Sequence, residues 1–312
     1  MKISIIGAGF VGSTTAYTLM MKSLAQEIVL VDINNVKAEA EALDILHASA
    51  LNFECDIYHG DYPDIKNSDI VIITVDSQKA LTDNRLALLE SNVKIMEQIV
   101  PQIVKYAPNC IMLIATNPVD VITKFALDLS GFSKEKVIGS GTVLDTARYR
   151  TMLGQYFDIS PVSVHSYVLG EHGASSLVSW STATIGGVNI EKYAKSFGKE
   201  LSDEFRNKIS EDVIDAGFKI YRGKKATYYG IAASLIKICE AIIKDKKQEL
   251  TVSTLHDDVC GVKNVCLSLP AIVGKKGAFN AIVPELNEEE TLKLKQSATA
   301  MKNAAAIVSK QG

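Results

Sequence analysis

The first half of the chain alternates short apolar runs with longer amphipathic segments. The apolar runs, rich in Ile and Val, occupy 3–6, 28–31, 70–75, 111–115 and 137–139. Continuous runs of this kind are typical of parallel strands that are buried on both faces. The segments between them have helical periodicity, at 10–22, 36–49, about 83–106 and 119–130, the last opening at Pro118. The pattern predicts an α/β fold, a doubly wound parallel sheet with helices on both faces.

The pattern changes after Asp145. We expect a helix over about 145–156, a strand over 163–168 and further strands near 180–187 and 249–255. Long helical patterns cover about 195–220, 225–244 and 287–309. Mixed order of this kind is typical of an α+β domain. We therefore predict two domains, a doubly wound domain over 1–144 and an α+β domain over 145–312.

Composition and charge exclude several classes of protein. The 312 residues carry 33 basic and 36 acidic side chains, which gives no broad positive field for nucleic acid. No apolar run reaches the ~18–20 residues that span a bilayer, and the chain opens on a strand pattern instead of a signal peptide. We expect a cytoplasmic protein that binds neither nucleic acid nor a membrane.

The cysteines and histidines do not suggest a metal site. The five cysteines are odd in number and scattered, with no CxxC pair, so we interpret them as reduced structural thiols. No cluster of His, Cys and carboxylates has the spacing of metal ligands, and we predict no metal. His47, His59 and His256 are interpreted as structural.

A glycine-rich turn follows the first apolar run. In the sequence Gly7-Ala8-Gly9-Phe10-Val11-Gly12, Gly7 permits a tight turn, Gly9 lets the backbone approach a pyrophosphate, and Gly12 allows close helix–strand packing. Asp32 follows the second apolar run, 20 residues after Gly12, where its carboxylate can bind both ribose hydroxyls of NAD and would repel the extra phosphate of NADP. The 1–144 domain is therefore predicted to be a Rossmann domain that binds NAD.

A carboxylate, a guanidinium and an imidazole occur together in the second half. Asp145 and Arg148 lie in the segment 143–148, and His172 lies between Gly170 and Gly173. An Asp can orient a His that acts as general acid and base, and an Arg can hold a substrate carboxylate by two parallel hydrogen bonds. These three groups suffice for hydride chemistry on a 2-hydroxy acid.

A series of motifs resembles, in order, the L-lactate dehydrogenase branch of the lactate/malate dehydrogenase family. They span nearly the whole chain and comprise Gly7–Gly12, Asp32, Ala115–Asp120, Leu144–Arg148, Gly170–Gly173 and Ala226–Gly230. The resemblance implies NAD-dependent interconversion of a 2-keto acid and its L-2-hydroxy acid, foremost pyruvate and L-lactate, as in glycolysis and fermentation. A sibling enzyme acting on L-2-hydroxyisocaproate or malate is the alternative.

The resemblance also implies roles for individual residues. His172 would donate the proton to the ketone, Asp145 would raise its basicity, and Arg148 would anchor the substrate carboxylate. Asn117 would position the nicotinamide ribose and the substrate oxygen, and Thr227 would line the substrate pocket. Arg85 would polarise the ketone from a mobile loop. Further cofactor contacts are expected from Phe10, Val11, Lys37, Tyr62 and Ala115.

A different class of protein, a non-catalytic regulator that binds NAD, also has to be considered. Such a protein would be expected to lose some of Arg85, Asp145, Arg148 and His172. All four are present, which favours the enzyme.

The chain departs from the family around its fourth strand. Val75-Asp76 stands where the family usually has Ala-Gly, and this places a charge close to the expected path of the cofactor. Leu81-Thr82 replaces the usual Pro-Gly of the mobile loop. Lys79 falls at the position that senses the substrate side chain, although a shift of one residue would put Gln78 there. The choice between Lys79 and Gln78 stays open.

Two further residues match a regulatory site of the family. Arg150 and His165 match positions where allosterically activated bacterial members bind fructose 1,6-bisphosphate between subunits. Arg150 lies about 200° around the helix from Arg148, at about 100° per residue, so it should point away from the active site. The resemblance further implies a homotetramer or a homodimer.

Overall fold

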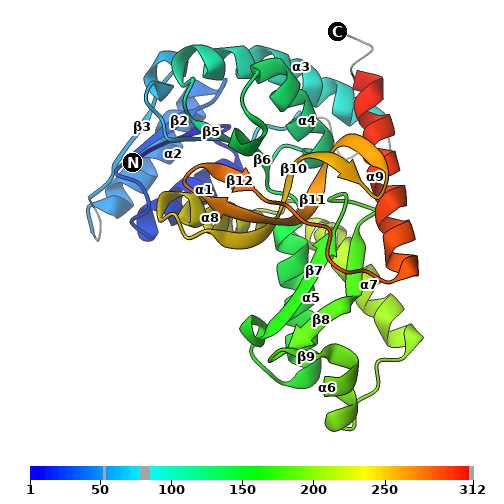
Figure 1. Cartoon of the computed structure of the whole chain (residues 1–312). Coiled ribbons are helices and arrows are strands. Elements are labelled where there is room, and N and C mark those ends of the chain that lie inside the picture. Colours follow the sequence, from blue (N-terminus) through cyan, green and yellow to red (C-terminus); the bar gives the residue numbers. More distant parts are fainter. Residues whose placement is uncertain (52–53, 78–84, 309–312) are drawn as a thin grey trace.

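A nine-stranded sheet and a smaller three-stranded sheet organise the chain (Figure 1). The computed structural model describes residues 1–51, 54–77 and 85–308. In the large sheet the strands follow the order β12-β11-β10-β6-β5-β4-β1-β2-β3. The small sheet has the order β7-β8-β9 and lies in the lower lobe of Figure 1 with α5, α6 and α7.

Six parallel strands form the first part of the large sheet. They are β1 (Lys2–Ile6), β2 (Glu27–Val31), β3 (Asp56–His59), β4 (Ile70–Ile73), β5 (Ile111–Ile114) and β6 (Val137–Gly139). Every residue of β4 and β5 is buried, as expected for strands covered on both faces. The four-residue strand β3 at the edge of the sheet was not predicted from the sequence.

Helices cover both faces of this sheet. One face packs on α3 (Arg85–Tyr106), α4 (Val119–Ser130) and α9 (Glu288–Val308). The other packs on α1 (Phe10–Met21), α2 (Asn35–Ser49) and α8 (Tyr229–Ile243). The predicted doubly wound α/β architecture is confirmed, and the second half of the chain supplies α8 and α9 to it.

The second half of the chain also extends the large sheet. A long hairpin of β10 (Gln248–Val259) and β11 (Val262–Gly274), followed by β12 (Gly277–Phe279), adds antiparallel strands beside β6. The hairpin turns at Cys260 and Gly261, both with positive φ, the backbone of a two-residue hairpin loop. The sequence predicted only a strand near 249–255. A domain boundary at 144/145 stays a prediction.

The lower lobe is built from α5 (Val143–Phe157), β7 (Val164–Leu169), β8 (Leu177–Ile185), β9 (Val188–Asn189), α6 (Ile190–Ser196) and α7 (Asp203–Lys224). The single helix expected over 195–220 is wrong, because α6 and α7 are separate. Gly198 adopts a positive φ of 63° between them, and the side chain of Ser202 caps α7 by accepting the Phe205 N–H. Short 3₁₀ turns occur at Tyr62–Ile65, Lys134–Lys136 and Pro161–Ser163.

Parallel strands bring the candidate residues to one edge of the sheet. Gly7 follows β1, Asp32 follows β2, Asp76 lies beyond β4 and Asn117 lies beyond β5. Ligands of open α/β sheets bind outside these carboxyl ends. A backbone bridge between Gly170 and Ser268 of β11 joins the loop after β7 to the same sheet.

Candidate active site

The glycine-rich turn between β1 and α1 is tightly packed. Gly7 has a φ of 107°, which L side chains rarely adopt. A Cβ placed on Gly12 would lie 1.9 Å from the carbonyl oxygen of Gly7, whereas a Cβ on Gly9 would meet nothing within 4 Å. Gly7 and Gly12 are therefore required by the fold, and Gly9 leaves open space beside the N-terminus of α1. This cradle fits the pyrophosphate of a dinucleotide.

Asp32 is fixed beside this turn. Its Oδ2 accepts the Ala8 N–H at 2.7 Å and its Oδ1 accepts the Asn34 N–H at 2.9 Å. A carboxylate has about four acceptor positions, so both oxygens can still accept hydroxyl protons of a ribose. The position agrees with the expected role of Asp32 in NAD binding.

The other expected cofactor residues lie at different depths. Phe10 is 64 % exposed at the start of α1, and the Lys37 ammonium lies 5.7 Å from its ring centroid. Val11 and Ala115 are half-buried. Tyr62 packs against the hydrophobic core, and burial raises the pKa of its phenol. Phe10 and Lys37 lie together at the start of α1, whereas Tyr62 contacts the core.

The structure brings His172, Asp145 and Arg148 together. The Nδ1 of His172 lies 2.6 Å from Oδ2 of Asp145, and Nη1 of Arg148 donates to Oδ1 of the same carboxylate at 2.7 Å. Asp145 and Arg148 are three residues apart on α5 and so share a face of the helix. Because Asp145 engages Nδ1, Nε2 of His172 is the ring nitrogen left for a substrate oxygen.

Charge and burial compete at this group of residues. Burial acts to lower the pKa of His172, but the charge and hydrogen bond of Asp145, with the charge of Asp120, raise it above the ordinary value. Burial likewise acts to raise the pKa of Asp145, and His172 and Arg148 lower it overall. The pair thus favours an imidazolium beside a carboxylate, the state needed by a proton donor.

Asp120 is a second carboxylate that supports His172, and sequence reasoning gave it no role. It is buried on α4, where its Oδ2 accepts the backbone N–H of His172 at 2.7 Å and its Oδ1 accepts the Ser253 hydroxyl at 2.6 Å. Burial raises the pKa of Asp120 to about 6. Its place directly after Asn117-Pro118-Val119 was the only available signal.

The loop that carries His172 is also held by hydrogen bonds to β11 and α9. Gly170, at a φ of 85°, exchanges two backbone hydrogen bonds of 2.9 Å with Ser268 of β11. The Glu171 N–H donates to Oγ of Ser297 on α9 at 2.8 Å. Together with Asp120, these contacts fix the backbone on both sides of the imidazole.

The two other described residues that are expected to bind substrate, Asn117 and Thr227, are both exposed. Asn117 is exposed after β5, and its carbonyl accepts the Asn92 amide at 2.7 Å. Thr227 is exposed in the turn before α8. Among the described residues, no hydrogen bond joins Thr227 to His172 or its partners. A Cβ on Gly230 would lie 3.0 Å from Leu144, so this turn packs beside the start of α5.

Lys79 and Gln78, with Leu81 and Thr82, lie outside the described residues. Arg85 is the first residue of α3, and its side chain is also outside the described part. Their expected roles stay predictions.

Arg150 and His165 lie away from the active site. The Arg150 guanidinium donates through Nε and Nη2 to the carbonyl of Ser166, at 3.3 and 3.2 Å. Ser166 follows the exposed His165 on β7. The packing of α5 on β7 therefore brings the Arg150 guanidinium to the residue that follows His165, and a shared ligand site stays a prediction.

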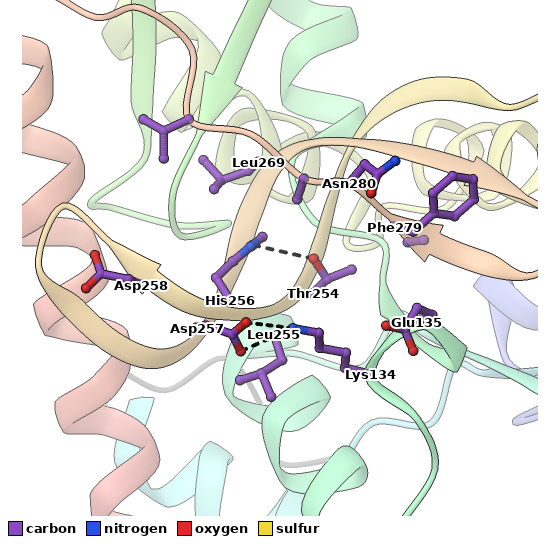
Figure 2. A pocket seen from close by; sticks show the side chains of 13 residues that line it. Lys134, Glu135, Thr254, Leu255, His256, Asp257, Asp258, Leu269, Phe279 and Asn280 are labelled. Carbon is purple, nitrogen blue, oxygen red and sulfur yellow. Dashed lines mark hydrogen bonds and ion pairs between the residues drawn. The ribbon is translucent and has the colours of Figure 1, made fainter.

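A separate hollow of about 420 Å³ lies on the hairpin side of the large sheet (Figure 2). In Figure 2 the buried His256 points toward Thr254, and Lys134 pairs with Asp257 at 2.9 Å. Nε2 of His256 lies 3.0 Å from the Leu267 carbonyl oxygen, and burial lowers the pKa of this imidazole. A neutral, hydrogen-bonded His256 agrees with its structural interpretation.

Over residues 1–51, 54–77 and 85–308, no group of three or more His, Cys, Asp or Glu residues could hold a metal ion. Within the same ranges, none of the helices is long and apolar enough to cross a membrane.

A cradle for a dinucleotide pyrophosphate, together with an imidazole whose pKa a paired carboxylate raises, is typical of a nicotinamide-dependent dehydrogenase. Comparison with known proteins agrees. Residues 1–139 match the lactate/malate dehydrogenase NAD binding domain, and residues 142–311 match the alpha/beta C-terminal domain of the same family. The chain belongs to the lactate/malate dehydrogenase family.

Individual relatives align over almost the entire chain. The L-lactate dehydrogenase of Thermus aquaticus is 45% identical over 308 residues, 99% of each chain. That of Clostridium perfringens is 46% identical over 301 residues, 96% of this chain and 95% of the relative. The crystal structure of a minor L-lactate dehydrogenase from Enterococcus mundtii superposes with a TM-score of 0.94 at 33% identity, covering 98% of both chains.

Proposed function

We propose that this protein is an NAD-dependent L-lactate dehydrogenase that interconverts pyruvate and L-lactate. The observation that carries the proposal is the Asp145 carboxylate, which holds His172 by one oxygen and Arg148 by the other. The bound nicotinamide supplies or accepts the hydride. In reduction, protonated His172 gives a proton from Nε2 to the substrate oxygen, and in oxidation the neutral ring takes it back.

Arg148 is suited to hold the substrate carboxylate. Only its Nη1 is engaged by Asp145 in the described contacts, and a guanidinium has five N–H donors in a fixed fork. The free side of the fork can bind a carboxylate in bidentate fashion, which a Lys could not do. Every 2-keto acid has this carboxylate, so Arg148 determines the class of substrate. Recognition of the side chain of the keto acid depends on other residues.

The test is a steady-state panel of 2-keto acids with NADH. Pyruvate should give the highest kcat/KM, above 2-ketoisocaproate and oxaloacetate. A higher kcat/KM with either of the latter would assign a sibling specificity. Absence of turnover with every keto acid, with NADH still bound, would favour the non-catalytic regulator.

Selectivity is proposed to depend on Lys79, with Gln78 as the alternative. An ammonium that faces the pocket would tolerate the extra carboxylate of oxaloacetate better than an amide. Lys79→Gln should then shift the ratio of catalytic efficiencies toward pyruvate by ~1–3 kcal/mol. The exposed Lys263 provides the control variant, Lys263→Gln. An unchanged ratio would assign the sensing to Gln78 or to the loop backbone.

We propose that subunits associate, as a homodimer or a homotetramer. Large apolar side chains are exposed on α1, α2 and α8, which pack side by side. They include Tyr17 (45 %), Val36 (79 %), Leu43 (49 %) and Tyr229 (67 %). An exposed apolar face of this kind is typical of a subunit contact. Sedimentation velocity measures the state, and a monomer at micromolar concentration would contradict it.

Fructose 1,6-bisphosphate is proposed as an activator bound by Arg150 and His165. If a two-fold axis brings two such pairs together, a bisphosphate would relieve their repulsion and bridge the subunits. The ligand should lower the KM for pyruvate and stabilise the oligomer. An undiminished response in an Arg150→Gln/His165→Gln double variant, or no response at millimolar ligand, would rule the site out.

A cytoplasmic location is also proposed. All five cysteines are free thiols, and four of them are buried. Thiols without disulfides are typical of reducing compartments.

A further inference from the structure

Asp76 lies between the glycine-rich turn and the end of β5. Its segment is held on both sides: Oγ1 of Thr74 donates to the Gly7 carbonyl at 2.9 Å, and Oγ1 of Thr116 donates to the Val75 carbonyl at 2.7 Å. The segment from Thr74 to Asp76 is therefore held by hydrogen bonds at the edge of the sheet where we expect the cofactor to bind.

The Asp76 carboxylate has a defined position. Asn92, fully buried on α3, donates through Nδ2 to Oδ1 of Asp76 at 2.9 Å and to the Asn117 carbonyl at 2.7 Å. Oδ1 of Asn92 accepts the Ser77 N–H at 2.8 Å. One buried amide thus ties Asp76 to Asn117, and the Asp76 residue itself is exposed.

The order of the strands tells which half of the cofactor passes Asp76. Across the sheet the order β5-β4-β1-β2 places Asn117, Asp76, the glycine-rich turn and Asp32 in sequence. Asp32 marks the adenosine ribose and the turn marks the pyrophosphate. Asp76 therefore lies on the nicotinamide side, toward Asn117.

The two redox states of the cofactor differ in charge at this end. The nicotinamide ring carries a positive charge in NAD⁺ and none in NADH, whereas the phosphates are the same. A fixed carboxylate attracts the oxidised ring and repels the phosphates of both forms. The carboxylate therefore favours the binding of NAD⁺ relative to the binding of NADH.

We propose that Asp76 is a specificity-determining residue for the redox state of the cofactor. Its charge raises the affinity for NAD⁺ relative to the affinity for NADH, compared with the same chain without this charge. The inference rests on the proposed function and deepens it. Tighter binding of the oxidised cofactor shifts the equilibrium on the enzyme toward NAD⁺ and the hydroxy acid.

The test measures the Kd of NAD⁺ and of NADH by calorimetry for the full-length protein and for Asp76→Asn. The amide oxygen introduced by this substitution can still accept from Asn92, so the change removes the charge and keeps the contact. We expect the ratio Kd(NADH)/Kd(NAD⁺) to fall about 2- to 10-fold, as a single charge at a partly solvated site allows. The fall should shrink in 0.5 M salt, since salt screens the charge.

Asp56→Asn is the matched control. Asp56 is an exposed carboxylate at the start of β3, at the opposite end of the strands, and its loss changes the net charge equally. The proposal is overturned if Asp76→Asn changes both Kd values by the same factor, or if Asp56→Asn alters the ratio as much. Wild-type protein that binds neither form would overturn the proposed function as well, whereas binding with an unchanged ratio overturns this inference alone.

Discussion

Asp120 gives a quantitative test of how the fold supports the catalytic imidazole. Its carboxylate is buried between the backbone N–H of His172 and the hydroxyl of Ser253. Burial raises its pKa from 3.8 to about 6, although both hydrogen bonds act to lower it. Replacing it by Asn removes the charge and leaves one of the two donors facing an amide NH₂.

Loss of the buried charge and loss of one acceptor change the free energy of unfolding in opposite directions. The shift of about two pKa units at about 1.4 kcal/mol per unit means that the ionised carboxylate costs ~3 kcal/mol at neutral pH. A buried donor without an acceptor costs ~1–3 kcal/mol. Asp120→Asn should therefore change the free energy of unfolding little at pH 7.5.

The pH dependence separates these effects. Because the folded pKa of Asp120 lies above the unfolded one, its stabilising contribution is complete below the unfolded pKa and is lost as pH rises through about 6. Between pH 7.5 and pH 5 the wild type should thus regain ~1–1.5 kcal/mol from this group. The variant should not, so it should become the less stable protein at pH 5.

Urea unfolding at pH 5 and pH 7.5 measures this difference, and the pH profile of kcat/KM for pyruvate reduction gives the His172 pKa. Since the charge of Asp120 raises that pKa, the variant's profile should move to lower pH. Asp128→Asn, an exposed change on the same helix, is the control. A stability difference that is equal at both pH values, together with an unmoved profile, would refute the reasoning.

Four further substitutions test the rest of the site. His172→Asn should lower turnover by about two to four orders of magnitude, the usual contribution of a positioned general acid, and calorimetry should show unchanged NADH binding. Asp145→Asn should lower the His172 pKa, so that pyruvate reduction declines at a lower pH than in the wild type; an unaltered pH profile would contradict the pairing seen at 2.6 Å. Gly12→Ala should lower the melting temperature because its Cβ would lie 1.9 Å from the Gly7 carbonyl, whereas Gly9→Ala should spare stability and weaken cofactor binding.

The parts of the fold predicted from sequence are those with a strong local pattern. Fully apolar runs such as 70–73 and 111–114 are buried on both faces and were found for that reason. The edge strand Asp56–His59 mixes polar and apolar residues and gives no such signal. The β10–β11 hairpin was missed because its turn uses Cys260-Gly261, without the Asn-Gly or Asp-Gly pair that marks such turns.

In the candidate site, too, local patterns revealed some residues and missed others. Asp145 and Arg148 are three residues apart, so helical spacing alone places them together. Ser253 reaches Asp120 across 133 residues, through a strand that joins the sheet of the first half, and no local pattern encodes that contact. Residue types and spacing could therefore suggest the reacting groups, whereas the groups that hold them depend on the completed topology.

The anchoring of the His172 loop has a consequence for biosynthesis. Its hydrogen bonds run to Ser268 and Ser297, which leave the ribosome long after the NAD-binding strands. The proton donor is therefore held in place only when translation is nearly finished. Premature termination before α9 should release chains that lack the Ser297 contact and cannot reduce a substrate.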